Sequence, residues 1–422
     1  MISWKKNLYA IWLAELFAIA GFNASMPIIP FYLQDMGVTD ANELNFWVGI
    51  IQSVSAIALG LVAPVWGRLA DSYGRRPMLL RAMFGGSIVI ALMGFATTPW
   101  QLLALRTFQG LLTGTVGAAT VLVAATVPIE ETGFGMGLLQ TAIFVGGSVG
   151  PMIGGFVSDL TSHRATFYVT SLLLAAGGLI VARFVHEEFT PQKAVGSFLR
   201  RIVPDFSPVL HSAPLLALLG ISFAIQMANG VVNPILPLFV QQITSNPSLV
   251  ASETGMVLGF GALSAALAAA IIGRFSFRLG YKRTLTIALA GAFLLTVPQA
   301  FSHTTVELLV FRLFGGFFLG GALPSVNALI ARNTSASNQG SVYGINTSVS
   351  SGGMAVGPAL GAVAAVAWGY PSTFLLTAAI LLITTLALAI VPRARARARR
   401  TASPARRVSG SERERDGNDI GV

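Results

Sequence analysis

The sequence lacks cysteine altogether and carries very little charge. None of its 422 residues is Cys, and only 10% are Asp, Glu, Lys or Arg. Without Cys the chain forms no disulfide and offers no thiol chemistry. Its four histidines are scattered, and no metal cluster, catalytic triad or phosphate-binding loop pattern is present in the sequence. The sequence therefore indicates no enzyme, no ATP-driven activity, no cofactor and no metal site.

The chain has instead a succession of long apolar segments. Hydrophobic residues make up 54% of it, and the mean hydropathy is +0.72. Lipid admits only helices and closed barrels, and these segments lack the alternation of barrel strands. We expect an all-α membrane protein with twelve transmembrane helices, arranged as two pseudo-symmetric six-helix bundles. The expected spans cover roughly residues 8–33, 46–66, 79–97, 101–128, 134–158, 165–184, 213–240, 254–272, 284–301, 305–330, 340–366 and 372–391.

Lys and Arg gather on one side of these spans. Lys5, Lys6 and most other basic residues fall on the side of the termini, whereas Arg164 falls on the other side. Positive residues collect in cytoplasmic loops, so we expect a multi-pass protein of the plasma membrane with both termini in the cytoplasm. The first apolar segment is too long for a cleaved signal and is interpreted as a retained span. The net charge of +10 favours contact with membrane lipid, not nucleic acid.

Residues 185–212 form the longest internal polar segment and divide the chain. We expect six-helix halves at 1–184 and 213–392, a cytoplasmic linker between them, and a disordered basic tail at 393–422. The halves repeat at a nearly constant offset. Arg106 recurs 206 positions later as Arg312, and Gly150 and Pro151 recur 207 positions later as Gly357 and Pro358. Such a duplication is expected of secondary transporters.

The stretch from Gly67 to Pro77 is dense in charge and joins two apolar segments. Its notable residues are Gly67, Asp71, Gly74, Arg75 and Arg76. The glycines permit a tight reversal of the chain. One interpretation is a gate latch, in which Asp71 and the arginines hold the cytoplasmic ends of the halves together. The alternative is a topology signal alone.

This stretch resembles the signature loop between the second and third helices of the major facilitator superfamily, in its drug/proton antiporter branch. Leu105 to Gly110 resembles the fourth-helix motif of that superfamily. Glycines and a proline of the fifth expected span match its antiporter motif, namely Gly137, Gly146, Gly150, Pro151, Gly154 and Gly155. The region around Trp4 to Asn7, with Gly21, Phe22 and Pro27 to Tyr32, most resembles MdtG-type multidrug resistance proteins.

The resemblance covers nearly all of residues 4–392 and implies a secondary transporter that exchanges its substrate for protons. It implies a role in proton coupling for Arg106 and an asymmetric latch, because Phe277 stands where Asp71 would repeat. It also implies that the fifth-helix motif marks an exchanger. Close helix packing through the glycines, with a kink permitted by Pro151, is a sufficient alternative for that motif.

Arg106 is also notable on physical grounds. A buried Arg costs roughly 2.5–3.5 kcal/mol on insertion scales, so it needs a partner or a wet cavity. Arg106, Gln109 and Thr113 share one helix face, which favours a cavity wall. The alternative is a structural tether whose side chain reaches the membrane surface. The repeat Arg312 has glycines in place of Gln109, and we expect it to be more structural.

Glu15 is the one acid placed well inside an expected span. An ionised carboxylate there is costly, so Glu15 is a candidate proton carrier. The helix 11 acid that the resemblance implies is replaced by Ser350 and Ser351, which strengthens this candidacy. The alternative is a Glu bonded to a neighbouring helix. Phe22 and Met26 share the face of Glu15 and suit an apolar ligand.

Prolines and scattered amides complete the candidate residues. Pro27 and Pro30, and their repeats Pro234 and Pro237, can bend helices at an outer gate or simply end them. Polar residues inside spans suggest a cavity with few charges, although each taken alone fits an interhelical hydrogen bond. The expected cavity residues are Phe22, Met26, Gln52, Gln109, Gln140, Gln226, Asn229, Asn233, Asn327 and Asn346.

The sequence thus predicts a monomeric, proton-coupled exporter of small amphipathic or cationic molecules that works by alternating access. The expected partners are a small-molecule substrate, protons and membrane lipid. Transport of one specific metabolite, such as a sugar, a peptide or a lipid, is the alternative on the same fold. A membrane receptor or scaffold that moves nothing is a further alternative, in which the duplicated gate motifs have no purpose.

Overall fold

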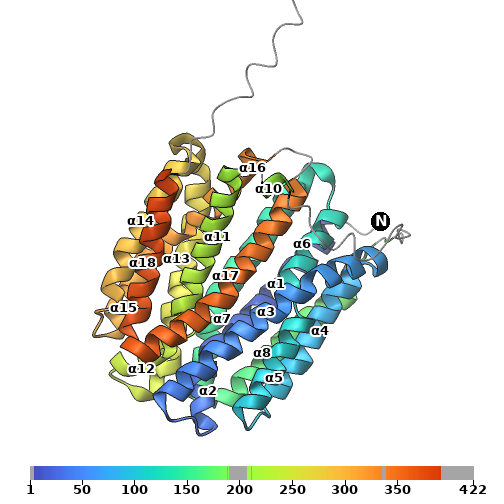
Figure 1. The fold of residues 1–422 in the computed structure, drawn as a ribbon. Helices are drawn as coiled ribbons and strands as arrows, with labels where there is room; N and C mark the ends of the chain where they lie inside the picture. The colour runs from blue at the N-terminus through green and yellow to red at the C-terminus, as the bar shows by residue number, and fades with distance from the viewer. Residues whose placement is uncertain (1–3, 188, 190–206, 211, 335–338, 391–422) are drawn as a thin grey trace, which may run out of the picture.

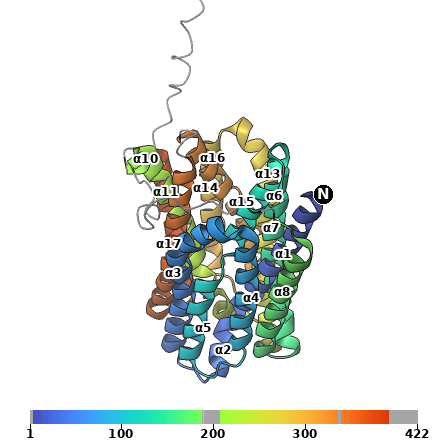
Figure 2. The same ribbon diagram turned by 90° about the vertical axis from the view of Figure 1, so that its right-hand side faces the viewer.

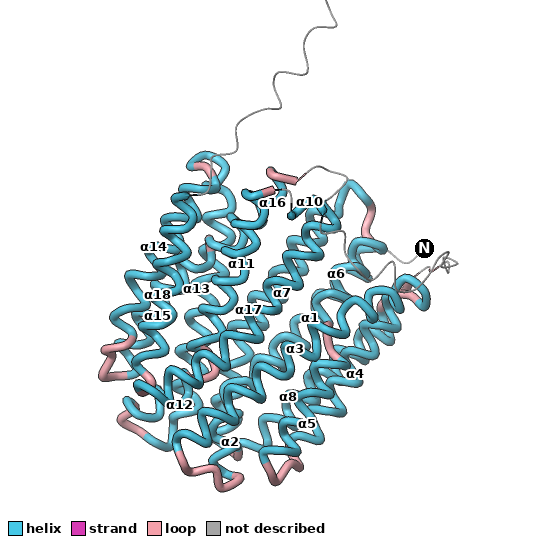
Figure 3. Tube along the Cα trace, in the orientation of Figure 1, coloured by secondary structure: helices cyan, strands magenta, loops and turns pink. Residues whose placement is uncertain are grey.

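The computed structural model describes residues 4–187, 189, 207–210, 212–334 and 339–390. Within these ranges the regular structure is entirely helical, and Figure 3 shows only helices and loops. The long helices run side by side between two faces (Figure 1). We call the face where α1 begins and α18 ends the terminal face, and the other the opposite face. The expected tail and most of the expected linker lie outside the described residues.

All twelve expected spans are helical, and most of their ends lie close to those predicted. The first half comprises α1 (Trp4–Ser25), η1 (Met26–Ile28), α2 (Ile29–Asp35), α3 (Ala41–Tyr73), α4 (Arg75–Met93), α5 (Pro99–Leu112), α6 (Thr115–Thr126), η2 (Ile129–Glu131), α7 (Thr132–Leu160) and α8 (His163–Phe184). After the short α10 (Ser207–Leu210), the second half comprises α11 (Ala213–Val232), α12 (Leu236–Ile243), η3 (Pro247–Leu249), α13 (Val250–Leu279), α14 (Tyr281–Gln299), α15 (Thr305–Gly320), α16 (Ala322–Arg332), α17 (Gln339–Trp368) and α18 (Pro371–Ile390).

Among the described segments, eleven are long and apolar enough to cross a membrane. The expected span that falls short is α14, which is only 19 residues long and opens with Tyr281, Lys282, Arg283 and Thr284. It nevertheless packs beside α15 and α18 within the second bundle. The helical count therefore agrees with the prediction, and the hydropathy of α14 is lowered by its polar start.

Four of the expected spans are broken into two helices. Span one breaks at Met26–Ile28 and span seven at Asn233–Ile235, both beside the paired prolines. Span four breaks at Gly114, whose φ of 111° lies in the left-handed region that favours glycine. Span ten breaks at Gly321. These spans occupy equivalent places in the two halves, as the sequence duplication requires.

The second span is longer than predicted, because α3 continues through Gly67 to Tyr73. Gly67 therefore lies within a helix, exposed, and only Gly74 makes the reversal into α4, with a φ of 98°. Its repeat Gly280 has a φ of 87° at the same turn between α13 and α14. The charged residues extend the helix beyond its apolar part rather than forming a loop.

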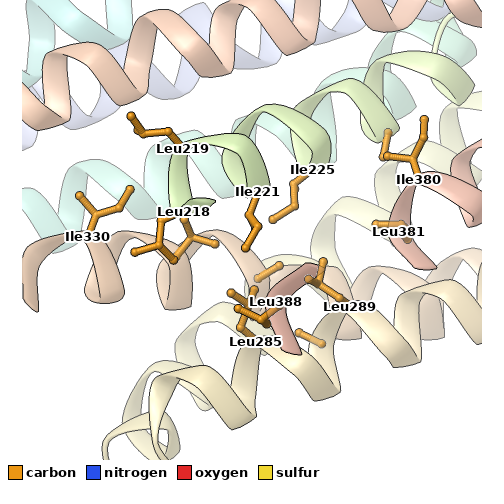
Figure 4. Packing of buried hydrophobic residues seen from close by; sticks show 14 of the residues in the cluster. Leu218, Leu219, Ile221, Ile225, Leu285, Leu289, Ile330, Ile380, Leu381 and Leu388 are labelled. Atoms are coloured by element: carbon orange, nitrogen blue, oxygen red, sulfur yellow. The ribbon is translucent and has the colours of Figure 1, made fainter. Parts of the chain in front are cut away.

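Each bundle has its own apolar core. In the second half a cluster from α11, α14, α16, α17 and α18 includes Leu218, Ile225, Leu289, Ile330 and Leu381 (Figure 4). A counterpart around α1, α4, α6 and α8 serves the first half. Figure 1 shows the two bundles lying side by side with their helices roughly parallel, and in Figure 2 the first half lies largely in front of the second.

The duplication extends to individual contacts. A side chain at Gly150 would strike the carbonyl oxygen of Ala20, and one at Gly357 would strike that of Met227, 207 positions after Ala20. In the same way, a side chain at Gly110 would strike the carbonyl oxygen of Ser55, and one at Gly316 would strike that of Gly261, at an offset of 206. The offset is 207 up to Pro237, 206 from Gly261 to Gly320, and 207 again from Gly344. Each change of offset therefore falls in a stretch that includes a connection between spans.

Candidate functional site

A cavity of about 830 Å³ lies between the two halves. Its wall is formed by residues of α1, α3 and α7 from the first half and by α11, α13, α14, α15 and α16 from the second. The residues Gly137 and Asn327 lie near the ends of α7 and α16 at the terminal face, whereas Pro27 and Pro234 lie at the helix breaks deeper in the bundle. The cavity therefore extends from the middle of the molecule toward the terminal face.

The opposite face is closed by contacts between the halves. An apolar cluster there joins Ile28 and Phe31 of the first half to Leu236, Phe239 and other residues of the second. Gln34 and Gln241, from α2 and α12, exchange two side-chain hydrogen bonds of 3.0 and 3.2 Å. Access to the cavity from this side is blocked in this conformation.

A further contact across the halves involves Asp159, near the end of α7. Its carboxylate accepts hydrogen bonds from the backbone N–H groups of Ala251 (3.3 Å) and Ser252 (2.7 Å), in the first turn of α13. A carboxylate at a helix N-terminus is stabilised by the unpaired N–H groups and by the helix dipole. One half thereby caps a helix of the other at the opposite face. The sequence gave no signal for this role of Asp159.

The fifth-helix glycine motif packs on two sides. Gly146, Gly150 and Gly154 lie against the backbone of α1 within the first half. Gly155 lies against the carbonyl of Ala251, and the Ser148 hydroxyl donates to the carbonyl of Gly259 at 2.8 Å, both across the halves. The motif therefore allows α7 to approach α1 and α13 closely at once. Pro151 lies inside the continuous helix α7 and also lines the cavity.

Most of the expected cavity residues do line this space. They are Met26, Gln52, Gln140, Asn229, Asn233 and Asn327, and Pro27, which was expected at a gate, lines the cavity as well. The sequence reasoning missed Asn23, Phe144, Gln299 and Arg312, which also line it. Asn23 lies one helical turn before Pro27, so its signal was available in the sequence.

Arg312 is the one charged side chain among the described residues that line the cavity. It lies on α15, and its guanidinium donates to the side-chain oxygen of Asn233 on α11. Gln299, from α14, also lines this region. The sequence favoured a structural role for Arg312, but its position in the wall presents a fixed positive charge to a bound molecule.

Arg106, the equivalent residue of the first half, is buried and does not line the cavity. It donates to the side-chain oxygen of Gln109 on its own helix at 3.0 Å, and its Nε and Nη2 atoms have no hydrogen-bond partner. The two halves differ at the positions of these partners. Asn233 corresponds to Met26 in the first half, and a thioether is only a weak acceptor, whereas Gln109 corresponds to Gly315 in the second half.

Glu15 is fully buried inside the first half, against α6. Its Oε1 atom accepts a hydrogen bond of 2.9 Å from the hydroxyl of Thr115, and its Oε2 atom has no partner. Thr115 is the first residue of α6, directly after the break at Gly114. In this conformation Glu15 is bonded to a neighbouring helix and does not face the cavity.

Other expected site residues lie away from the cavity. Phe22 packs in the first-half core and approaches Gly86, Gln109 is buried against Arg106, and Gln226 lies on α11 beside Gly353. Asn346 on α17 donates to the side-chain oxygen of Asn327 at 3.4 Å. Pro30 is buried in the first turn of α2, next to the break in span one.

The charged loop after α3 is bound within its own half. The backbone N–H groups of Arg75 and Arg76 donate to the carboxylate of Glu187, at distances of 2.7–3.0 Å. The Arg76 guanidinium donates to the carbonyl of Ala182 at 2.6 Å, at the end of α8. Glu187 follows α8 in the chain, and the sequence gave no signal for its role as the cap of α4. The side chain of Asp71 lies outside the described residues.

Comparisons with known proteins agree with this architecture. A family model described as Major Facilitator Superfamily matches residues 11–298 and 218–414. The chain is 34% identical to multidrug resistance protein MdtG of Klebsiella pneumoniae (strain 342) over 385 residues, which covers 91% of this chain and 93% of that protein. It is 35% identical to MdtG of Escherichia coli (strain SMS-3-5 / SECEC) over 383 residues, covering 90% and 93%.

Among solved structures, the nucleoside transporter NupG superposes with a TM-score of 0.72. The sequence identity is 15%, and the match covers 91% of this chain and 98% of that chain. This likeness concerns the fold alone, since residues at the cavity are free to differ at such identity.

Proposed function

Because the chain belongs to the Major Facilitator Superfamily, we propose that it exports small amphipathic molecules in exchange for protons, by alternating access. The observation that carries this proposal is the cavity between the halves, closed at the opposite face and extending toward the terminal face. A site at the interface of two repeats, exposed to one side at a time, is the arrangement that alternating access requires.

The distribution of basic residues supports an inward-facing state. Lys and Arg concentrate at the terminal face, so that face would be cytoplasmic. The bonds of Arg75 and Arg76 within the first half fit the same state, since a latch between the halves would form only when the terminal face closes. In the proposed cycle, substrate enters from the cytoplasm and leaves once the opposite face has opened.

The charge of the cavity narrows the substrate class. Arg312 and the surrounding amides offer hydrogen-bond donors, and no carboxylate occurs among the described lining residues. A fixed cation in a cavity of low polarity opposes a cationic ligand and favours an acceptor or an anionic group. We therefore propose neutral or anionic amphipaths as substrates, in place of the cationic ones that the sequence favoured.

Glu15 is the proposed proton carrier. It lacks a partner for Oε2, and it bonds to the first residue of α6, at the break in span four. A proton gained or lost by Glu15 would change its hydrogen bond to Thr115. The position of α6 relative to α5, the other part of span four, would then depend on the protonation of Glu15. Arg106, with two unpartnered nitrogen atoms, and Asp71 remain further candidates for coupling.

The proposal is tested by transport into proteoliposomes under an imposed pH gradient. Matched anionic, neutral and cationic fluorescent amphipaths are compared for the wild type, Glu15→Gln and the control Glu130→Gln, which removes an exposed acid at the terminal face. We expect gradient-driven transport that is lost in Glu15→Gln and kept in Glu130→Gln, while exchange of substrate without a gradient persists in both.

Two results would change the assignment. Gradient-driven transport that survives in Glu15→Gln would remove Glu15 from the coupling step. Transport of a single compound class, with none of the amphipaths moved, would favour a transporter of one metabolite.

A further inference from the structure

A second cavity, of about 450 Å³, lies on the outside of the first half at the terminal face. It is a groove between the first turns of α1 and the end of α8, lined by Lys6, Tyr9, Ala10, Arg183, Phe184 and His186. It is separate from the central cavity, with which it shares no lining residue. We call it the α1–α8 groove.

The groove combines cationic heads with an exposed apolar surface. Lys6 and Arg183 are exposed, and neither forms an ion pair among the described residues. Tyr9 is 52% exposed and Phe184 57% exposed, which is unusual for side chains of this size unless they face lipid or a partner. Both charges and both rings lie near the start of α1 and the end of α8, at the terminal face.

The backbone of the groove is held in place by a reciprocal pair of hydrogen bonds. The Asn7 side chain donates to the carbonyl of His186 at 2.7 Å and accepts from its N–H at 3.1 Å. Asn7 is itself buried, with 6% of its surface exposed. This clamp joins α1 to the chain beyond α8 and fixes the spacing of the two groove walls before any ligand arrives.

The nearest described acid does not neutralise the groove. Glu187 directly follows His186, but its carboxylate is bound to the N–H groups of Arg75 and Arg76 at the start of α4. Only 5% of its side chain is exposed. The positive charge of Lys6 and Arg183 is therefore left to attract an anion from outside the protein.

We propose that the α1–α8 groove binds the headgroup of an anionic phospholipid from the cytoplasmic leaflet. Lys6 and Arg183 would hold the phosphate, and Tyr9 and Phe184 would lie along the glycerol and the start of the acyl chains. Basic pockets between helices at this membrane face are suited to acidic lipids, and each basic residue near the surface contributes about 1 kcal/mol. Aromatic rings favour the same interfacial depth.

Neither the dipole of α8 nor the linker accounts for the groove as well as a lipid does. Arg183 in the last turn of α8 interacts favourably with the helix dipole, but this explains neither Lys6 nor the exposed rings. Residues 188–206 follow Glu187 in the chain and carry Lys193, Arg200 and Arg201 against Glu188 and Asp205, which leaves this segment with a net positive charge. A basic segment is a poor complement to a basic groove, whereas an acidic lipid matches it.

The test is native mass spectrometry of the full-length protein, purified in detergent and titrated with phosphatidylglycerol or phosphatidylcholine of equal chain length. The wild type is compared with the double variant Lys6→Gln, Arg183→Gln and with Lys5→Gln. Lys5 is the neighbouring exposed lysine, and it does not line the groove. We expect phosphatidylglycerol to bind the wild type and Lys5→Gln alike, and the double variant about tenfold more weakly, with no such difference for phosphatidylcholine.

Equal retention of phosphatidylglycerol by the double variant and the wild type would overturn the proposal. Glycerol phosphate is included as a competitor to separate a lipid site from a site for free phosphate. We expect it not to displace the lipid, since it lacks acyl chains for the apolar wall. Displacement at equal concentration would reassign the groove to a soluble anion. A Tyr9→Ala variant, which keeps both charges, should lose part of the lipid binding.

Discussion

Arg106 and Arg312 occupy equivalent positions in the two halves but bond to different kinds of partner. Arg312 reaches across to Asn233 on a different span and faces the cavity, whereas Arg106 bonds to Gln109 on its own helix and is buried. The duplicated scaffold therefore carries one arginine in the cavity wall and one in the interior of the first half. The position of Asn233 in the second half is occupied by Met26 in the first.

Arg312→Gln should weaken the binding of anionic amphipaths by about 10- to 100-fold, because a hydrogen bond to a charged group contributes about 1.5–3 kcal/mol. A neutral analogue of the same size should be nearly unaffected. Binding is measured by quenching of protein fluorescence by each ligand. The control is Arg278→Gln, which removes an exposed arginine at the end of α13, away from the cavity. Equal weakening for charged and neutral ligands would show that Arg312 only supports the structure.

The sequence located many cavity residues but not the charge of the cavity. The amide residues of the cavity could be recognised because polar residues are rare in apolar segments. The contrast between Arg106 and Arg312 was not, because it depends on which side chain faces each arginine from another helix. Glu187 was missed for a similar reason, since it lies 112 positions from the backbone group of Arg75 that it caps.

Helix α7 contacts three parts of the molecule, namely the rest of its own half, the other half and the central cavity. One side of it packs on α1 through glycines, another contacts α13 of the other half, and Gly147 and Pro151 line the cavity. Movement of α7 relative to either neighbour is therefore limited by backbone contact. The tight contacts of Gly150 and Gly154 with α1 favour motion of α7 together with α1 as a unit.

Gly150→Ala should destabilise the protein, since the new methyl group would press on the carbonyl oxygen of Ala20. Overpacking of this kind costs about 1–3 kcal/mol. The readout is the temperature at which half of the purified protein aggregates in detergent. Gly147→Ala is the matched control on the same helix, because an added methyl group there meets no atom within 4 Å. A loss of the same size in both variants would contradict the packing argument.

Asp159 of α7 caps the start of α13 across the two halves. Asp159→Ala should shift the equilibrium toward states with the opposite face open, because a lost N-cap costs about 0.5–2 kcal/mol. The distance between spin labels at Thr161→Cys and Gln242→Cys, both exposed at that face, reports this shift by pulsed electron resonance. Since the chain has no native cysteine, these labels attach nowhere else.

The control for this measurement is Asp35→Ala, which removes another acid of the opposite face. Asp35 pairs with His163 at 2.6 Å, within the first half, so its loss should leave the distance between the halves unchanged. If both variants widen the distance equally, the effect would come from the surface charge and not from the cap.

The element boundaries were predicted well where hydropathy changes sharply and poorly where it does not. Ends such as Phe184 and Ala213 lie at such changes and were found to the residue. The extension of α3 to Tyr73 was missed, because charged residues beyond the apolar part of a span look like a loop, although they continue the helix. The breaks beside Pro27 and Pro234 followed from proline chemistry, whereas the break at Gly321 carried no such signal.

For the whole molecule, the two halves meet at the opposite face and leave a cavity toward the terminal face. Crosslinking the double variant Gln34→Cys, Gln241→Cys should hold the protein with its opposite face closed, because the native side chains are already within hydrogen-bond distance. Transport in proteoliposomes should stop after treatment with a short reducible bifunctional thiol reagent and return after reduction. Each single variant treated alike serves as the control. Unchanged transport in the joined protein would show that the opposite face need not open.

The offset between the halves shifts from 207 to 206 after Pro237 and returns to 207 before Gly344. After an ancestral doubling, residues were therefore gained or lost between Pro237 and Gly261 and between Gly320 and Gly344, or in the equivalent stretches of the first half. The glycine contacts kept their register because a one-residue slip would turn each of them by about 100° around the helix axis. Each of these stretches includes a connection between spans, and these connections are the positions at which an epitope or a fluorescent protein can be inserted with least disturbance.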